Sequence, residues 1–167
     1  ANKCLHGITG AAFVISKNET FEESAGNSSS MYLDLYNYWV SQKDGWCPFT
    51  PSIHSLYSLQ EALNELEDLG GVRHRNKRYK ETARIIREQL ALHGVDLLIE
   101  EGSYSSMISS FYIPEKKSYK EIYDFFLEQG FVIYSGQGEL ANKIFRICNM
   151  GDINDSDISV LSSVIRK

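Results

Sequence analysis

A pair of adjacent glycines, Gly70 and Gly71, separates two segments with helical periodicity. The first begins near Ser52, and its apolar residues share one helix face: Leu56, Leu59, Leu63 and Leu66. The second ends at Gly94, and its expected buried stripe has the same spacing: Tyr79, Ala83, Ile86 and Leu90. Because glycine ends helices and permits a sharp change of direction, we expect two helices joined here. The sequence therefore predicts a domain boundary, with residues 1–70 and 71–167 on either side.

The chain beyond Gly94 alternates short apolar runs with helical patterns. Helices are expected after Ser118, which has Glu121 at capping-box spacing, and in the polar cluster that opens with Asn154. Short apolar segments predict four strands: 95–99, 107–113, 131–134 and 144–148. Helices interleaved with strands indicate a sheet with helices over one face, which is an α/β fold.

The chain before the glycines has fewer regular signals. The apolar run 11–16 predicts a buried strand, and the polar segment 18–30 a surface connection with one short helix. Residues 31–40 are aromatic and are expected to be helical. Two prolines exclude a regular helix over 44–51.

Composition limits the class of protein. A chain of 167 residues with 43% hydrophobic residues can bury a core. Its net charge of −5 disfavours a nucleic-acid partner, and no apolar run is long enough to cross a bilayer. The three cysteines are widely spaced, which favours reduced thiols in the cytoplasm and no metal site. Because the chain opens with Ala1, we expect it to be part of a longer protein.

One lysine, Lys3, lies in a setting that suits a reactive amine. It is surrounded by small and polar residues, and Gly7 and Gly10 follow it closely. A lysine that condenses with a carbonyl must be uncharged part of the time, so its surroundings have to desolvate it or oppose its charge. The glycines would let the backbone approach a bulky cofactor. The alternative is an ordinary solvated lysine.

Two further residues are candidates for binding anions. Arg146 lies among apolar residues in the predicted strand 144–148, so its guanidinium either pairs with an internal carboxylate or faces a cleft, where its planar fork suits an anionic substrate. Thr50 follows the proline-bounded loop, where its hydroxyl and backbone could donate to a phosphate or simply form a turn.

Beyond these residues, the segment around Lys3 resembles the lysine segment of the 2-aminoethylphosphonate:pyruvate aminotransferase family, which are class V aminotransferases with the pyridoxal-phosphate fold. The resemblance is carried first by Asn2-Lys3-Cys4, Gly7, Gly10 and Phe13-Val14-Ile15. Other matches follow in the same order: Leu33–Tyr36, Phe49-Thr50 with His54, Gly70-Gly71-Val72, Arg78-Tyr79, Gly130–Tyr134 and Phe145–Ile147. They cover this whole chain but only about the C-terminal half of the family's chain.

The resemblance implies a role for each candidate residue. Lys3 would bind pyridoxal 5′-phosphate covalently and later move a proton between substrate and cofactor. Thr50 would reach the cofactor phosphate of the neighbouring subunit, which implies a homodimer with a shared active site. Arg146 would hold the substrate's carboxylate or phosphonate.

The resemblance also implies a domain plan and a reaction. Residues 1–70 would complete the large domain of a fold-type I aminotransferase, and residues 71–167 would form its small C-terminal α/β domain. The whole protein would transfer the amino group of 2-aminoethylphosphonate to pyruvate. Alternatives are an alanine- or serine-glyoxylate aminotransferase and a non-catalytic α/β binding module. Thr9, Ser135 and Cys148 depart from the family pattern, and we expect these 167 residues alone to be inactive.

Overall fold

A computed structural model describes all 167 residues, which divide into two compact units, 1–63 and 64–167. The division falls within helix α3 (Ile53–Asp68). The assignment of residues 1–70 and 71–167 to a large and a small domain stays a prediction. None of the helices combines the length and apolar character that crossing a membrane requires.

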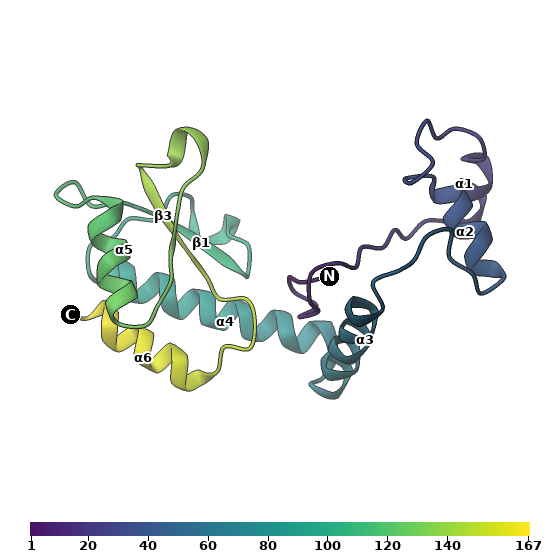
Figure 1. The fold of residues 1–167 in the computed structure, drawn as a ribbon. Helices are drawn as coiled ribbons and strands as arrows, with labels where there is room; N and C mark the ends of the chain where they lie inside the picture. The colour runs from purple at the N-terminus through teal and green to yellow at the C-terminus, as the bar shows by residue number, and fades with distance from the viewer. The chain divides into compact units, whose positions relative to one another are not determined.

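The first unit contains α1 (Asn18–Glu23), α2 (Leu35–Lys43) and the first part of α3 (Figure 1). The carboxylate of Asp34 caps α2 by accepting a hydrogen bond from the backbone of Asn37 at 3.2 Å. Helices α1 and α2 contact each other through the stacked rings of Phe21 and Trp39, 5.7 Å apart. The expected short helix and aromatic helix are thus confirmed, with α2 beginning four residues later than predicted.

The predicted strand 11–16 is wrong. These residues form no regular structure, and the side chain of Ile15 is 87% exposed. A strand needs a neighbour to satisfy its backbone hydrogen bonds, and the first unit contains no other strand. The apolar run therefore forms no strand ladder, and only the Ala11 carbonyl is bonded, by the Ala1 amino group at 3.2 Å.

The predicted leucine face of α3 is only partly buried. Leu66 is buried and Leu59 half-buried, whereas Leu56 and Leu63 are 47% and 42% exposed. The other buried residues of the helix are Ser55 and Ala62. Ser55 is buried because the first ten residues of the chain pack beside it.

The second unit combines an antiparallel sheet with three helices. The strands β1 (Ile108–Tyr112), β3 (Ile144–Cys148) and β2 (Tyr134–Ser135) lie in the order β1-β3-β2. The helices are α4 (Gly71–Leu92), α5 (Tyr119–Glu128) and α6 (Asp155–Ile165), and two short 3₁₀ turns cover Glu101–Ser103 and Gly138–Leu140. The predicted strand 95–99 is reduced to a single bridge from Leu97 to Phe111. The strand expected at 131–134 begins only at Tyr134.

The helix boundaries follow from their caps. Ser118 and Glu121 form the predicted capping box at the start of α5, and Asn154 forms a second one with Asp157 at the start of α6. Before α4, Gly70 has φ 92°, a left-handed conformation that favours glycine. The glycine pair therefore ends one helix and begins the next, as predicted.

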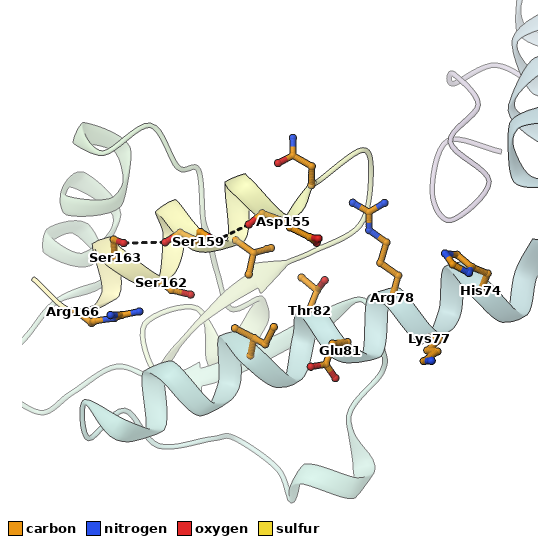
Figure 2. Close-up of a pocket in the computed structure, with 13 residues that line it drawn as sticks. His74, Lys77, Arg78, Glu81, Thr82, Asp155, Ser159, Ser162, Ser163 and Arg166 are labelled. Atoms are coloured by element: carbon orange, nitrogen blue, oxygen red, sulfur yellow. Dashed lines mark hydrogen bonds between the residues drawn. The ribbon is translucent and has the colours of Figure 1, made fainter. Parts of the chain in front are cut away.

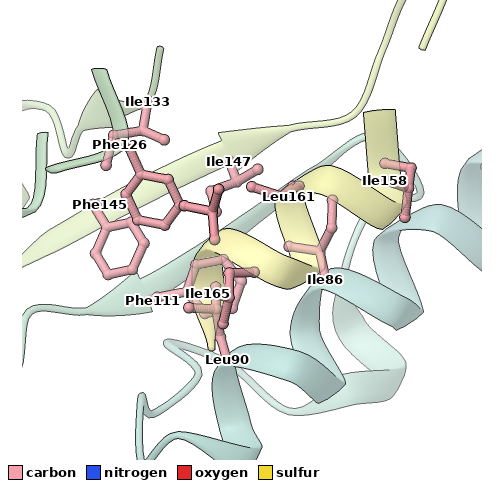
Figure 3. Packing of buried hydrophobic residues seen from close by; sticks show 11 residues of the cluster. Ile86, Leu90, Phe111, Phe126, Ile133, Phe145, Ile147, Ile158, Leu161 and Ile165 are labelled. Carbon is pink, nitrogen blue, oxygen red and sulfur yellow. The ribbon is translucent and has the colours of Figure 1, made fainter. Parts of the chain in front are cut away.

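The core lies between the sheet and the helices, and Figure 3 shows its buried side chains. Helix α4 contributes Ile86 and Leu90, and α5 contributes Phe126. Helix α6 contributes Ile158, Leu161 and Ile165. The sheet contributes chiefly the stacked rings of Phe111 and Phe145, which are fully buried. The helices thus cover one face of the sheet, and the other face takes no part in this core.

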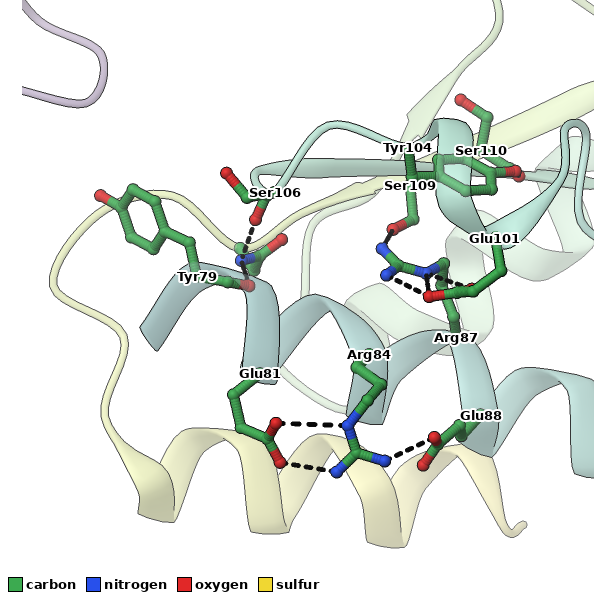
Figure 4. Close-up of polar contacts among 11 residues, drawn as sticks. Tyr79, Glu81, Arg84, Arg87, Glu88, Glu101, Tyr104, Ser106, Ser109 and Ser110 are labelled. Atoms are coloured by element: carbon green, nitrogen blue, oxygen red, sulfur yellow. Dashed lines mark hydrogen bonds and ion pairs between the residues drawn. The ribbon is translucent and has the colours of Figure 1, made fainter. Parts of the chain in front are cut away.

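A buried arginine ties the segment before β1 to α4 (Figure 4). Arg87 of α4 is 7% exposed, and its guanidinium donates to both carboxylate oxygens of Glu101, with Nε 2.7 and 2.9 Å away. It also donates to the hydroxyl of Ser109 at 3.1 Å. The buried charge is therefore paired and hydrogen-bonded, which is what burial of a guanidinium requires.

Candidate functional site

Lys3 lies on a tight loop at the start of the first unit. The Lys3 carbonyl accepts a hydrogen bond from the His6 backbone at 3.0 Å, and the Ala1 carbonyl accepts one from Gly7 at 3.1 Å. His6 has φ 66°, which is unusual for a residue other than glycine. These bonds close the chain on itself, so Lys3 lies on an ordered loop.

The Lys3 loop, residues 1–10, is attached to the first turns of α3. Ser55, a buried residue, donates its hydroxyl proton to the Thr9 carbonyl at 2.9 Å. Ser58 accepts a hydrogen bond from the Ile8 backbone at 3.1 Å. Two serine side chains of one helix therefore fix the backbone that follows the lysine.

The glycines of this loop permit close packing within the first unit. A Cβ atom on Gly7 would lie 3.2 Å from the Ala1 carbonyl oxygen and 3.5 Å from the Cα of Leu59. A Cβ atom on Gly10 would lie 2.5 Å from the Ser55 hydroxyl oxygen, and Gly10 has φ 114°. Their lack of a side chain thus lets the loop approach itself and α3, and the expected approach to a cofactor stays a prediction.

Thr50 lies in the same unit, three residues before α3 begins at Ile53. The Lys3 loop and the segment that carries Thr50 therefore both adjoin the start of α3. The side chains of Lys3 and Thr50 are exposed. No contact joins them, and their expected roles stay predictions.

Arg146 belongs to the second unit, where it occupies the middle of the central strand β3. Its register partners are Ser110 on β1 and Tyr134 on β2. Register partners point to the same face of a sheet, and neighbours along a strand point to opposite faces. Since Phe145 and Ile147 enter the core, Arg146 emerges on the face opposite the core.

The guanidinium of Arg146 is held at one nitrogen only. Its Nε donates to the backbone carbonyl of Ser135 at 2.9 Å, and the side chain is half-buried. No protein group bonds its two terminal nitrogens, and no carboxylate pairs with it. Of the two alternatives that the sequence left open, the internal ion pair is therefore absent. A guanidinium fixed at Nε presents its other N–H groups in a fork that suits a carboxylate or phosphonate.

A groove between α4 and α6 is a second candidate (Figure 2). It has a volume of about 840 Å³ and contains none of the predicted site residues. Arg78 extends across it but donates to the Ile153 carbonyl. The hydroxyls of Ser159 and Ser163 donate to carbonyls of their own helix. These three polar side chains are thus already bonded to backbone carbonyls.

Sequence reasoning missed two polar residues of the second unit. Tyr119, whose ring packs against the core, donates its hydroxyl proton to the Ile133 carbonyl at 3.1 Å. Arg87 was not singled out, although it is one of the two buried arginines of α4. A buried tyrosine normally bonds its hydroxyl, but periodicity alone does not name the partner.

The chain was compared with known proteins. No protein-family model matches the sequence. The chain is 37% identical over 168 residues to a 2-aminoethylphosphonate–pyruvate transaminase of Bacillus cytotoxicus, and 37% identical over 170 residues to one of Salmonella typhimurium. In both cases 99% of this chain aligns, and it spans 46% of the relative.

Solved structures with the same fold are aminotransferases as well. The alanine–glyoxylate aminotransferase of Nostoc sp. matches with a TM-score of 0.71 and 25% identity, over 82% of this chain and 37% of its own. The ureidoglycine–glyoxylate aminotransferase of Bacillus subtilis matches with a TM-score of 0.77 and 23% identity, over 98% and 43%. The second likeness concerns the fold alone.

The curated relatives and the solved structures that this chain resembles are aminotransferases, and the chain shares their mixed α/β fold. Within that class, nearly the whole chain is similar to part of the 2-aminoethylphosphonate–pyruvate transaminases. The chain spans about half the length of these relatives, a coverage that is consistent with the predicted C-terminal part.

Proposed function

We propose that the protein to which this chain belongs is a pyridoxal-phosphate-dependent transaminase that moves the amino group of 2-aminoethylphosphonate to pyruvate, giving phosphonoacetaldehyde and alanine. The observation that carries this proposal is 37% identity along 99% of the chain to transaminases of that name. The half-buried guanidinium of Arg146, which has no carboxylate partner, supports it with a group suited to an anionic substrate.

The residues of the Lys3 loop fit the cofactor. The Lys3 side chain is exposed and in no ion pair, so its amine is accessible, and the loop is anchored by Ser55 and Ser58. These 167 residues do not themselves desolvate Lys3 or oppose its charge, so the rest of the enzyme would have to do so. Pyridoxal phosphate, when bound, would supply an electron sink. Lys3 would hold the cofactor through Nζ, and the same nitrogen would take a proton from the substrate and return it.

Thr50 is proposed to donate its hydroxyl proton to the cofactor phosphate of a neighbouring subunit, so the enzyme would be a homodimer with a shared active site. Exposed apolar side chains of the first unit, such as Ile15 and Trp46, support a contact surface for another protein chain here.

We also propose a cytoplasmic location, because three widely spaced cysteines suit a reducing compartment.

A second candidate is an alanine- or serine-glyoxylate aminotransferase. It is favoured by the structural likeness to the Nostoc alanine–glyoxylate aminotransferase at 25% identity. The two candidate enzymes differ in the amino donor that they prefer, because a phosphonate dianion needs more positive charge around it than a carboxylate does. Turnover of 2-aminoethylphosphonate, alanine and serine by the full-length protein, compared at equal concentration, decides between them.

Replacement of Lys3 tests the proposal directly. In the full-length protein, Lys3→Ala should abolish both turnover and the yellow colour of the bound cofactor. Lys17→Ala is the matched control, because Lys17 is an exposed lysine in the same unit. Survival of colour and turnover in Lys3→Ala would favour a non-catalytic α/β binding module. The 167-residue chain alone should show no turnover.

Replacement of Arg146 tests the substrate site. Arg146→Gln should lower kcat/KM for the anionic amino donor by about 30-fold or more, because it removes one partner of a charge pair. Arg146→Lys should recover only part of this loss, since an ammonium lacks the planar fork. Unchanged kcat/KM in Arg146→Gln would refute the role of this residue.

A further inference from the structure

The carbonyl that holds Arg146 lies at a free edge of the sheet. The Gly136 backbone donates to the Ile144 carbonyl at 3.0 Å, so these two residues form a hydrogen-bonded antiparallel pair. Hydrogen-bonding groups alternate in direction along such a strand, so Ser135, one residue earlier, points its N–H and C=O away from β3. Since β2 is an edge strand, nothing in the sheet itself restrains them.

Tyr119 supplies the missing restraint. It is the first residue of α5, and its hydroxyl donates to the Ile133 carbonyl at 3.1 Å. Ile133 lies two residues before Ser135 on the same segment. The phenol therefore holds the backbone one residue before β2 begins at Tyr134.

Tyr119 and Arg146 reach this edge from opposite faces of the sheet. The ring of Tyr119 packs against the core cluster, whereas Arg146 emerges on the face away from it. Burial is the main cause that raises the pKa of Tyr119, and the nearby positive charge of Arg146 acts in the opposite direction. The phenol is therefore neutral and protonated at physiological pH, the state in which it can donate to Ile133.

We propose that Tyr119 is a positioning residue for the anion-binding guanidinium: it holds the Ile133 carbonyl and so restrains the segment that leads to Ser135, whose carbonyl fixes Nε of Arg146. This inference rests on the proposed function of Arg146. The cap of α5 extends the network, because the Ser118–Glu121 capping box sets where the helix begins and hence where Tyr119 lies. Tyr119 itself touches no reacting group.

Tyr119→Phe removes the hydroxyl and keeps the ring. In the full-length enzyme it should raise KM for the anionic amino donor by about threefold to tenfold, as expected for loss of about one hydrogen bond, and leave kcat and cofactor colour unchanged. Tyr123→Phe is the matched control, because Tyr123 lies one turn further along the same helix, 5.8 Å from the Tyr119 ring, and its hydroxyl makes no hydrogen bond. Equal KM values in the two variants would overturn the proposal.

A second measurement is independent of catalysis. In the 167-residue chain, the Nε–H signal of Arg146 in ¹⁵N NMR, assigned by its loss in Arg146→Gln, should exchange slowly with water. Tyr119→Phe should make this exchange fast, and Tyr123→Phe should not. If Tyr119→Phe leaves it slow, positioning is refuted even where Arg146→Gln abolishes turnover. If exchange becomes fast while Arg146→Gln leaves turnover intact, positioning stands and the proposed role of Arg146 fails.

Hydroxyl exchange covers the case in which Tyr119→Phe does not fold. In the wild-type chain the hydroxyl proton of Tyr119 should exchange slowly with water, because it is donated to the Ile133 carbonyl. The hydroxyl proton of Tyr123, which makes no hydrogen bond, gives a reference for unprotected exchange. Equal, fast exchange at both positions would overturn the proposal.

Discussion

Phe145 lies opposite Phe111 in the sheet, and their rings stack with centroids 5.3 Å apart. Both side chains are fully buried. Because side chains alternate between the faces of a strand, the burial of Phe145 also determines the face on which its neighbour Arg146 emerges. The stability of the core and the orientation of the candidate anion site therefore depend on the same pair.

Phe145→Ala tests this dependence. Loss of the ring removes a stacking partner and leaves a cavity in the core, so the free energy of unfolding should fall by about 3–5 kcal/mol. Val132→Ala, at an exposed position, should change it by less than about 0.5 kcal/mol. Urea denaturation of the 167-residue chain, followed by circular dichroism, measures both. Similar midpoints for the two variants would contradict the assigned core.

Two arginines of α4 show how burial changes the contribution of the same side chain to stability. Arg87 is buried and bonds Glu101 and Ser109, whereas Arg84 bonds Glu81 and Glu88 on the exposed surface. Arg87→Ala should lower the free energy of unfolding by about 1–3 kcal/mol, because bonds to a charged group are lost from a buried position. Arg84→Ala should have little effect, since solvent screens exposed pairs. Denaturation curves of equal midpoint would contradict this difference.

Acid should weaken α5 through its capping box. Glu121 accepts hydrogen bonds from the hydroxyl and backbone N–H of Ser118, both at 2.7 Å, and these bonds lower the pKa of Glu121. The folded state thus favours the ionised carboxylate. This contribution is present above the unfolded pKa of about 4.3 and is lost as the pH falls through the lower folded pKa.

Glu121→Gln should therefore flatten the dependence of stability on pH below about pH 4.3. Glu128→Gln removes the same charge from the same helix without removing a cap bond. Its stability should therefore fall with decreasing pH as that of the wild type does. Urea midpoints measured between about pH 2 and pH 6 provide the comparison. An unchanged slope in Glu121→Gln would show that the cap makes no pH-dependent contribution.

Local signals in the sequence predicted the helices of the second unit well. Ser118 and Asn154 are polar residues at caps, and Tyr79, Ala83, Ile86 and Leu90 are buried as their period predicts. Such signals depend on residues one or two helical turns apart, so the sequence contains them directly. Arg146 could be singled out for a similar reason, because a charge within an apolar strand needs a partner or a ligand.

Long-range contacts account for what the sequence did not predict. The run 11–16 has strand composition but no strand beside it, and α3 turns Ser55 inward because a loop 46 residues away binds there. Tyr119 packs its ring against the core, and its hydrogen bond to Ile133 depends on where the edge of the sheet lies. No local pattern contains that information.

The anchoring of the Lys3 loop can be tested with two glycines of similar conformation. Gly10 and Gly26 have φ 114° and 73°, so alanine is strained at both positions. A Cβ atom at Gly10 would also lie 2.5 Å from the Ser55 hydroxyl oxygen, whereas one at Gly26 meets nothing within 4 Å. Gly10→Ala should therefore destabilise the first unit more than Gly26→Ala does, by about 1–3 kcal/mol, the cost of an unsatisfied buried group.

A double variant isolates the clash from the backbone strain. Ser55→Ala removes the hydroxyl that a new Cβ at Gly10 would meet, so adding Gly10→Ala to that background should cost no more than Gly26→Ala costs in the wild type. Amide exchange of residues 1–10 and thermal melts of the 167-residue chain report the four variants. If Gly10→Ala lowers the free energy of unfolding equally with and without the serine hydroxyl, Ser55 does not hold this loop. The loop that carries Lys3 would then have to be anchored elsewhere in the unit.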